Sequence, residues 1–446
     1  MEAEDPPAPA PPTLLYGLHD AMSPGRAALV GLQHAMAMFI GIVTPPLIIA
    51  RSLELSAEVT AYLVSMALLA SGLSTLVQVR TVGPVGSGLL SVQGTSFSFL
   101  TPLIQAGQLG GLPLMIGMSL ALAPVEMVLS RFLTRLRRVF TPVVSGVVVL
   151  LIGLSLVPVA AQSIAGGLGS DAPPGAGLAV AVLVLTVAVA MQVARPPWAR
   201  ISAVAVALLI GYAVCAATGR LSPPPPGSTE WLVVPVPVKF GLAFRWELAL
   251  PFLLIYLLTA IETMGDITAT LQLSREPIEG PLYWRRLSAG VLADGMNSAL
   301  AALCNSFPNT TFSQNNGLIQ LTGVASRQAG YWVAGLLCAF GLFPLVGRWM
   351  AVMPGPVLGG VTLLLFGLVA AAGVRILQQA TLAHREMLIV ALSLAVGLGV
   401  QMVPQVLHPL PATARMVLGS AITAGGLTAL ALNALIPRES SGHSPE

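Results

Sequence analysis

The sequence predicts an all-α polytopic membrane protein built from two halves of seven helices each. Its 446 residues are 55% hydrophobic and only 9% charged, whereas a typical soluble domain carries about 25% charged residues. Fourteen apolar stretches follow one another along the chain as candidate membrane segments. A proline-rich segment separates the seventh stretch from the eighth. Composition, the number of apolar stretches and the position of this segment together indicate the fold class.

The apolar stretches have boundaries that sequence reading fixes only to within about two to four residues. They centre on residues 27–49, 59–79, 84–105, 112–131, 140–161, 176–193, 200–218, 246–272, 286–304, 311–324, 329–347, 356–374, 386–403 and 413–436. The predicted divisions are a disordered cytoplasmic tail rich in proline and acid at 1–25, a first repeat at 26–218, a linker at 219–245, a second repeat at 246–436 and a cytoplasmic tail at 437–446.

The distribution of arginine and lysine predicts the orientation in the membrane. If the N-terminus is cytoplasmic, 15 of the 21 basic residues flank the cytoplasmic side and 6 flank the opposite side. Cytoplasmic loops carry the excess of positive charge in membrane proteins. We therefore expect a multi-pass protein of the inner or plasma membrane with both termini in the cytoplasm. The net charge of +3 reflects this topology and indicates no nucleic-acid partner.

Two of the apolar stretches are interrupted by polar or small residues. One contains VGPVGSGLLSVQGTSFSFL at 82–100, and the other contains NSFPNTTFSQNNGLIQLTG at 305–323. Each is the third stretch of its half, and an odd number of helices per half inverts the second half relative to the first. Paired interrupted segments in inverted halves indicate a transporter's binding site near the middle of the membrane. Non-helical backbone at that depth must line a cavity or be buried in protein.

Ionisable residues within the apolar stretches are few, and each is costly at the centre of a bilayer. Glu262 and Asp266 are one turn apart in the eighth stretch and face one side of a helix. Asp294 lies in the ninth stretch, and His34 lies beside Gln33 in the first. A buried carboxyl group exchanges its proton closer to neutral pH, so the group indicates proton handling. For His34 alone, a hydrogen-bonded core histidine is the simpler interpretation.

Glu126 is interpreted differently because it lies near the predicted cytoplasmic end of the fourth stretch, about one turn from Arg131. This spacing predicts a structural ion pair between the two residues.

Motifs of membrane enzymes are missing from the sequence. It contains no HExxH, no GxSxG and no Cys/His pattern with metal-ligand spacing. The sequence therefore predicts a protein that is not an enzyme and that has no metal site and no cofactor.

Taken together, the polar residues resemble one family, the nucleobase-ascorbate transporters, also called nucleobase-cation symporter family 2. The resemblance extends from about residue 26 to residue 436. The matching motifs are a Gln-His pair in the first stretch, a Gly-Thr-Ser-Phe turn in the third, Glu-x-x-Gly-Asp in the eighth, Asp in the ninth, and Gln-Asn-x-Gly followed after four residues by Thr-Gly in the tenth. They are found here as Gln33 and His34, Gly94 to Phe97, Glu262 to Asp266, Asp294, and Gln314 to Gly323.

The resemblance implies a particular fold and mechanism. Spans 1–4 and 8–11 would form a core domain, and spans 5–7 and 12–14 a gate domain. Short strands would precede the half-helices of spans 3 and 10. The implied activity is proton symport of a nucleobase by an elevator-type movement of the core against the gate, in a homodimer that assembles through the gate domains. The bound proton would be the coupling ion, with no other cofactor.

The resemblance also implies roles for individual residues. Glu262 would accept N–H bonds from the base, and the amide of Gln314 would donate and accept at another edge. Phe97 would stack on the ring of the base or form the cavity wall beside it, with Ser96 nearby. The remaining matched residues would couple the proton or support the site, namely Gln33, His34, Asp266, Asp294, Asn315 and Thr322.

Two of these positions bear on the substrate. In the family, uracil transporters usually have Glu at the position of Gln314 and His at that of Asp266, and ascorbate transporters have Pro at the former. The residues present here favour xanthine or uric acid. Sodium coupling through the buried aspartates stays open, as do uracil or ascorbate as substrates. An anion carrier of the same architecture is less favoured, because Glu262 would repel an inorganic anion.

Overall fold

The computed structural model describes residues 14–135, 141–168, 173, 175–221, 223 and 231–437. The first half contains α1 (Pro24–Ser52), α2 (Ala57–Val79), β1 (Gln93–Thr95), the 3-10 helix η1 (Phe97–Phe99), α3 (Leu100–Leu129), α5 (Pro142–Ala165), α6 (Ala176–Gln192) and α7 (Pro197–Ala217). The second half contains η2 (Trp246–Leu248), α8 (Ala249–Leu273), α9 (Gly280–Leu303), β2 (Asn309–Thr311), α10 (Gln314–Thr322), α11 (Arg327–Leu342), α12 (Pro344–Ala351), α13 (Gly355–Leu377), α14 (His384–Met402), η3 (Pro404–Leu407), α15 (Ala412–Leu418) and α16 (Ala421–Leu435).

The described chain is mostly helical, as the sequence predicts. By length and composition, seven of its described helices are apolar enough to cross a membrane, or eight if α11 and α12, which meet at a bend of 70°, form one crossing. Two helices begin after a serine whose side chain caps the helix N-terminus. The side chain of Ser56 accepts the backbone N–H of Val59 at the start of α2, and that of Ser326 accepts the N–H of Gln328 at the start of α11.

Helix α3 joins two segments that the sequence analysis separates. The predicted third and fourth stretches, 84–105 and 112–131, meet in this helix at a break. Gly111 has φ +65° and ψ −162°, and the backbone is non-helical at Gly110 as well. Only glycine adopts such angles readily, and Pro113 follows closely. The chain therefore changes direction here without an intervening loop.

The two short strands that the family resemblance implies are present. β1 and β2 pair in antiparallel orientation, with Gln93 opposite Thr311 and Thr95 opposite Asn309. The backbone N–H of Phe312 donates to the carbonyl of Val92 at 3.0 Å, which extends the pairing past the end of β2. All residues of both strands are buried. The pair joins the two interrupted segments in the interior of the protein.

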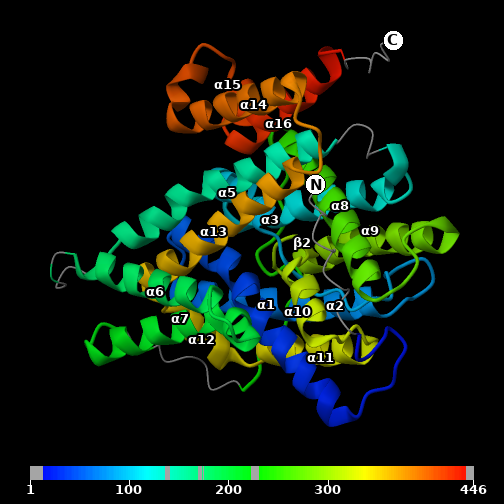
Figure 1. Cartoon of the computed structure of the whole chain (residues 1–446). Coiled ribbons are helices and arrows are strands. Elements are labelled where there is room, and N and C mark those ends of the chain that lie inside the picture. Colours follow the sequence, from blue (N-terminus) through cyan, green and yellow to red (C-terminus); the bar gives the residue numbers. More distant parts are fainter. Residues whose placement is uncertain are drawn as a thin grey trace, which may run out of the picture.

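The helices pack in two groups, and each group draws from both halves of the chain (Figure 1). In one group α2 packs against α9 and α11, and α3 packs against α8 and α9. In the other α5 packs against α13 and α16, and α6 packs against α7 and α13. α14 and α16 also pack together, at the top of the view in Figure 1. A cavity lies at the boundary between the two groups.

Residues 14–23 differ from the predicted disordered tail. Tyr16 forms a parallel bridge with Val324. The backbone N–H of Leu15 donates to the carbonyl of Gly323 at 2.8 Å, and the hydroxyl of Ser326 donates to the carbonyl of Asp20 at 2.9 Å. This segment covers the junction between α10 and α11 because it satisfies backbone groups left open there. Residues 1–13 and 438–446 lie outside the described residues.

The predicted linker at 219–245 is described at 219–221, at 223 and from residue 231 onward. The backbone N–H groups of Val233, Val238 and Ala243 donate to the carbonyls of Leu342, Leu303 and Pro113. The segment from 231 to 245 therefore runs past the ends of α11 and α9 to the break in α3.

Candidate functional site

A cavity of about 560 Å³ lies between the two helix groups. α1, η1 and α10 form one wall, and α6, α7 and α13 form the other; its lining includes Met38, Phe97, Gln192, Arg200, Phe312, Gln314, Gly317 and Leu365. The sequence-predicted residues Phe97 and Gln314 therefore share one cavity. The ring of Phe97 also makes an edge contact with Phe366 at 6.0 Å between ring centroids. An aromatic wall with a nearby amide suits a flat, polar ring.

Asp266 organises the junction between β2 and α10. Its two carboxylate oxygens accept hydrogen bonds from the hydroxyls of Thr311 and Ser313, each at 2.7 Å. Its backbone carbonyl accepts from the hydroxyl of Thr270 at 2.8 Å and from the amide of Asn316 at 3.3 Å. Asp266 thus anchors the start of α10, which carries Gln314, to α8.

His34 and Asn315 form a second support for α10. The amide nitrogen of Asn315 donates to the carbonyl of Leu90 at 2.6 Å, which turns its Oδ1 toward His34. The Nδ1 of His34 lies 2.9 Å from this oxygen and must carry the donated proton. Nε2 of His34 is buried and has no hydrogen-bond partner among the described residues. His34 therefore contacts α10 through Asn315, and its role in proton coupling or site support stays a prediction.

The remaining predicted residues, two supporting residues and the substrate-binding Ser96, are placed differently. The hydroxyl of Thr322 donates to the carbonyl of Leu318 at 2.8 Å, within α10. The side chain of Gln33 is exposed on α1, so it shares neither the burial nor the hydrogen bonds of its neighbour His34. Ser96 donates its backbone N–H to Pro308, while its buried hydroxyl has no partner among the described residues.

Asp294 lies where α9 crosses α3. Its Oδ2 accepts a hydrogen bond from the hydroxyl of Thr263 at 2.7 Å. A side chain at the next residue, Gly295, would place its Cβ only 2.8 Å from the backbone nitrogen of Met127. The two helices therefore touch at backbone distance beside Asp294 and Glu126.

The predicted ion pair between Glu126 and Arg131 is wrong. Glu126 is fully buried and its carboxyl group interacts with that of Asp294, whereas Arg131 is exposed. The two described salt bridges, Arg286–Glu276 and Arg385–Glu386, lie elsewhere. α3 ends at Leu129, so Arg131 is beyond the helix and five positions from Glu126, which is outside the spacing that pairs side chains on one helix face.

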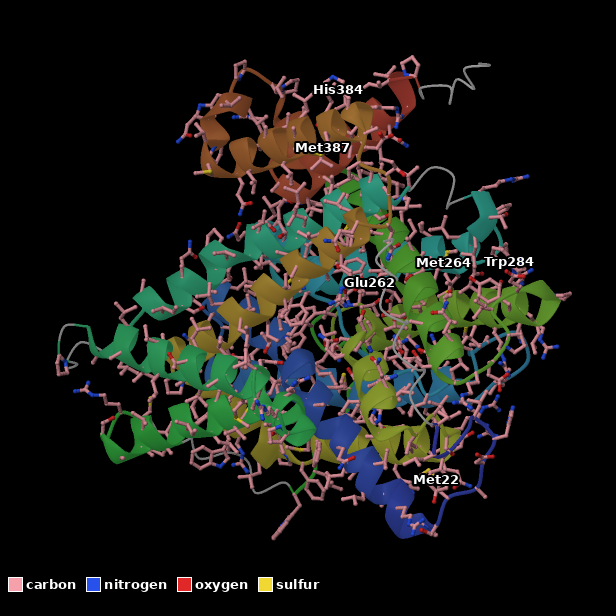
Figure 2. The ribbon with its side chains drawn as sticks, viewed as in Figure 1. Met22, Glu262, Met264, Trp284, His384 and Met387 are labelled. Atoms are coloured by element: carbon pink, nitrogen blue, oxygen red, sulfur yellow. The ribbon has the colours of Figure 1, made fainter. Side chains whose placement is uncertain are left out.

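Glu262 belongs to a group of acidic side chains that also contains Asp266 and Asp294. It is partly buried, and its carboxyl group interacts electrostatically with those of Asp266 and Asp294. Figure 2 shows Glu262 near the middle of the molecule. It is not among the residues that line the cavity described above. A Cβ built at Gly265, on the same helix, would meet nothing within 4 Å, and the same holds at Gly317 in α10. Both helices therefore border open space near the site.

Comparison with known proteins decides the family. The family profile described as a permease family matches residues 25–406. The chain is 46% identical to the xanthine permease XanP of Escherichia coli (strain K12), over 96% of this chain and 95% of that protein. The chain belongs to the nucleobase-ascorbate transporter family.

Further members of the nucleobase-ascorbate transporter family match along nearly the whole chain. The xanthine permease XanQ of Escherichia coli (strain K12) is 43% identical over 95% of this chain and 94% of its own length. A uric acid-xanthine permease of Emericella nidulans is 32% identical over 96% of this chain and 84% of its own length. These relatives are permeases and not enzymes.

Solved structures of more distant transporters have a similar fold. The transmembrane domain of the cyanobacterial bicarbonate transporter BicA superposes with a TM-score of 0.60 at 13% identity, covering 93% of this chain and 99% of that chain. Murine Slc26a9 gives a TM-score of 0.62 at 13% identity, covering 94% of this chain and 69% of that chain. At this identity the likeness concerns the fold alone.

Several residues of this nucleobase-ascorbate transporter site were missed by sequence reasoning. Gln192 and Arg200 line the cavity from α6 and α7. In the sequence, Arg200 is one of the 15 basic residues that flank the predicted cytoplasmic side, and nothing distinguishes it from the others. Thr263 gives no signal in a single sequence, because threonine is common in apolar helices. Thr311 lies within the polar run at 305–323, although nothing in that run marks it as a partner of Asp266. Ser313 lies within the polar run that contains Gln314, and the spacing of that run was the available signal.

Proposed function

We propose that this transporter takes up xanthine or uric acid together with a proton. The observation that supports this best is the cavity between the helix groups, which presents Phe97 and Gln314, the latter next to Ser313, whose hydroxyl donates a hydrogen bond to the buried Asp266 of α8. Its relatives bear the names xanthine permease and uric acid-xanthine permease. An aromatic side chain and an amide suit a planar purine that presents alternating N–H and C=O groups.

The proposed mechanism is an elevator movement in a fold of fourteen spans, arranged as two inverted seven-helix repeats. α1–α3 and α8–α11 would move as the core against a gate that contains α5–α7 and α13–α16. The packing of helices in two groups with the cavity between them supports this division. The homodimer would assemble through the gate, so that the core of each subunit can move.

In the proposed complex, Glu262 accepts N–H bonds from the purine and the Gln314 amide donates and accepts at another edge. Phe97 stacks on the ring, and the buried hydroxyl of Ser96, which lacks a partner among the described residues, is available nearby. Purine binding at Glu262 requires that the base reach beyond the cavity wall formed by α10. The open space beside Gly265 and Gly317 supports such an approach.

The proposed proton site is the carboxyl pair of Glu126 and Asp294. Both carboxyl oxygens of Glu126 and the Oδ1 of Asp294 are buried and have no hydrogen bond of normal geometry among the described residues, although Thr259 and Gln93 lie close enough to interact with the pair. One proton shared between the two groups would satisfy two of these oxygens and remove the repulsion between like charges. Glu262 interacts with this pair as well, which would couple the proton to the bound purine.

Uptake into proteoliposomes tests the proposed function. Labelled xanthine, urate, uracil and ascorbate are offered under an inward proton gradient, an inward sodium gradient or neither. We expect accumulation of xanthine or urate with the proton gradient alone. Accumulation driven only by sodium, or a preference for uracil or ascorbate, would contradict the proposal.

Replacement of Gln314 by Glu is expected to weaken recognition of xanthine and urate. The substitution removes the N–H donor of the amide and adds a negative charge, so a purine carbonyl loses its partner and affinity falls by about tenfold. Competition of a nucleobase panel against labelled xanthine measures the effect. The control is Gln379→Glu, the same change at an exposed position just after the end of α13. An unchanged order of preference in Gln314→Glu would contradict the assigned role.

Replacement of Glu126 by Gln is expected to separate binding from proton coupling. The amide keeps the size of the side chain and can donate an N–H bond to Asp294, so xanthine binding should persist. The shared proton has no site in this variant, so most of the proton uptake that accompanies xanthine binding should be lost. Calorimetric titration in buffers of different ionisation enthalpy counts these protons. Equal proton uptake by wild type and Glu126→Gln would eliminate the pair as the proton site.

A further inference from the structure

A second cavity, of about 580 Å³, is lined by four arginines. Arg131 follows the end of α3, Arg285 and Arg286 lie in the first turns of α9, and Arg327 begins α11. The loop from Thr81 to Ser87 forms the remaining wall. The cavity shares no lining residue with the one that contains Gln314. Three segments that are far apart in the sequence thus bring their positive charges to one hollow.

The positive charge of this cavity is only partly neutralised. Arg286 forms a salt bridge with Glu276 at 2.6 Å. Arg327 experiences repulsion from Arg286 and attraction from the same Glu276. The Nε of Arg327 is buried and has no hydrogen-bond partner among the described residues. Like charges held together with a buried, unpartnered donor are stabilised by an anion that accepts several hydrogen bonds.

The backbone at Gly88, which follows this loop, lies close to the guanidinium of Arg327. Gly88 has φ +69°, and a Cβ at this position would lie 2.9 Å from Nη2 of Arg327 and 2.5 Å from the hydroxyl of Thr81. The backbone N–H of Gly86 donates to the carbonyl of Ala289 at 3.0 Å, which fastens the loop to α9. The backbone that forms this wall of the cavity is therefore fixed to α9. A preformed fork of guanidinium groups matches the geometry of a phosphate.

Side chains around the cavity are typical of a membrane boundary. Trp284 is adjacent to Arg285 and is 37% exposed, and Leu282 and Phe132 are exposed as well. Figure 2 shows Trp284 at the periphery of the molecule, on the side of α9. Tryptophan is enriched at the level of lipid headgroups. All four arginines flank stretches on the side predicted to face the cytoplasm, where anionic lipids give the membrane surface its negative potential.

We propose that this cavity binds the phosphate of an anionic phospholipid headgroup, with Arg285 and Arg327 as its principal ligands. The chemistry shared with free phosphate is a tetrahedral oxyanion; the exposed tryptophan and leucine beside it favour the lipid as its source. This inference does not depend on which substrate the transporter moves. Arg286 forms a salt bridge with Glu276. It would add positive charge near the phosphate while keeping this salt bridge.

Native mass spectrometry of the full-length protein in neutral detergent tests the proposal. Binding of phosphatidylglycerol and phosphatidylcholine is compared for wild type, Arg285→Gln, Arg327→Gln and the double variant. At about 1 kcal/mol per arginine, the double variant should bind phosphatidylglycerol about 30-fold more weakly. The matched control is Arg375→Gln, which removes an exposed arginine from the end of α13 and should leave binding unchanged.

Three outcomes are decisive. Preference of wild type for phosphatidylglycerol, lost in the double variant and retained in the control, supports the proposal. Equal binding of the two lipids by wild type, or undiminished phosphatidylglycerol binding by the double variant, overturns it. Thermal unfolding with added inorganic phosphate distinguishes the sources. Stabilisation by phosphate that requires Arg285 and Arg327, without any lipid preference, would overturn the lipid assignment in favour of a soluble phosphate. The single variant Arg285→Gln changes an exposed side chain and should fold normally. Weaker lipid binding by this variant would therefore not result from misfolding.

Discussion

Glu262→Gln is expected to lower the affinity for xanthine by about 10- to 100-fold. A hydrogen bond to a charged acceptor contributes about 1.5–3 kcal/mol, and the amide replaces one acceptor oxygen by a donor that faces the N–H of the base. Glu262 has no described salt bridge, so its replacement leaves no buried cation without a partner. The variant should therefore fold. Binding by calorimetry and initial uptake rates at several xanthine concentrations measure the effect.

The control for this variant is Glu58→Gln, an identical change at an exposed position in the first turn of α2. Its affinity should equal that of the wild type. If Glu262→Gln also binds xanthine with wild-type affinity while eluting as a folded protein, Glu262 does not contact the base. The acidic group of α8 and α9 would then serve the proton alone.

Asp266→Ala is expected to destabilise the protein by about 3 kcal/mol and to abolish most uptake. The substitution removes two charge-assisted hydrogen bonds, from Thr311 and Ser313, and leaves both hydroxyls without their acceptor. These bonds hold the segment that leads into α10, so Gln314 should lose its fixed position. Thermal unfolding in detergent, with and without xanthine, measures both effects.

Asp20→Ala is the matched control for Asp266→Ala. Asp20 is exposed and accepts a backbone N–H from Gly17 at 2.7 Å, so its loss should cost little. Asp266→Asn retains one acceptor oxygen and should fall between wild type and Asp266→Ala. Equal unfolding temperatures of Asp266→Ala and Asp20→Ala would show that the two short hydrogen bonds do not hold α10.

Composition and hydropathy were sufficient to predict a helical, multi-pass membrane protein, because the bilayer imposes a strong and simple pattern on sequence. The interrupted segments predicted a binding site near the middle of the membrane. The family resemblance implied the two short strands, and its motifs implied that Phe97 and Gln314 face the same ligand. The break at Gly111 was harder to place, since hydropathy does not distinguish a loop from a kink.

The arrangement of the acids depended on tertiary structure. Spacing along the chain placed Glu126 near Arg131, but the end of α3 and the close approach of α9 at Gly295 brought it to Asp294 instead. The position of Arg200 on the cavity could not be predicted, because in the sequence it resembles the other arginines that flank membrane segments. The composition of the N-terminal segment predicts disorder at 1–25, whereas residues 14–23 make backbone hydrogen bonds with the junction between α10 and α11.

The pairing of β1 with β2 ties the two halves of the chain together. Each strand has only three residues, yet their mutual hydrogen bonds and fixed register connect the segment that ends in Phe97 to the one that begins α10. Neither helix end can shift alone without breaking bonds that have no water to replace them. A purine held between these ends would therefore contact both halves of the chain at once. A substitution that breaks the pairing of either strand should affect both sides of the cavity.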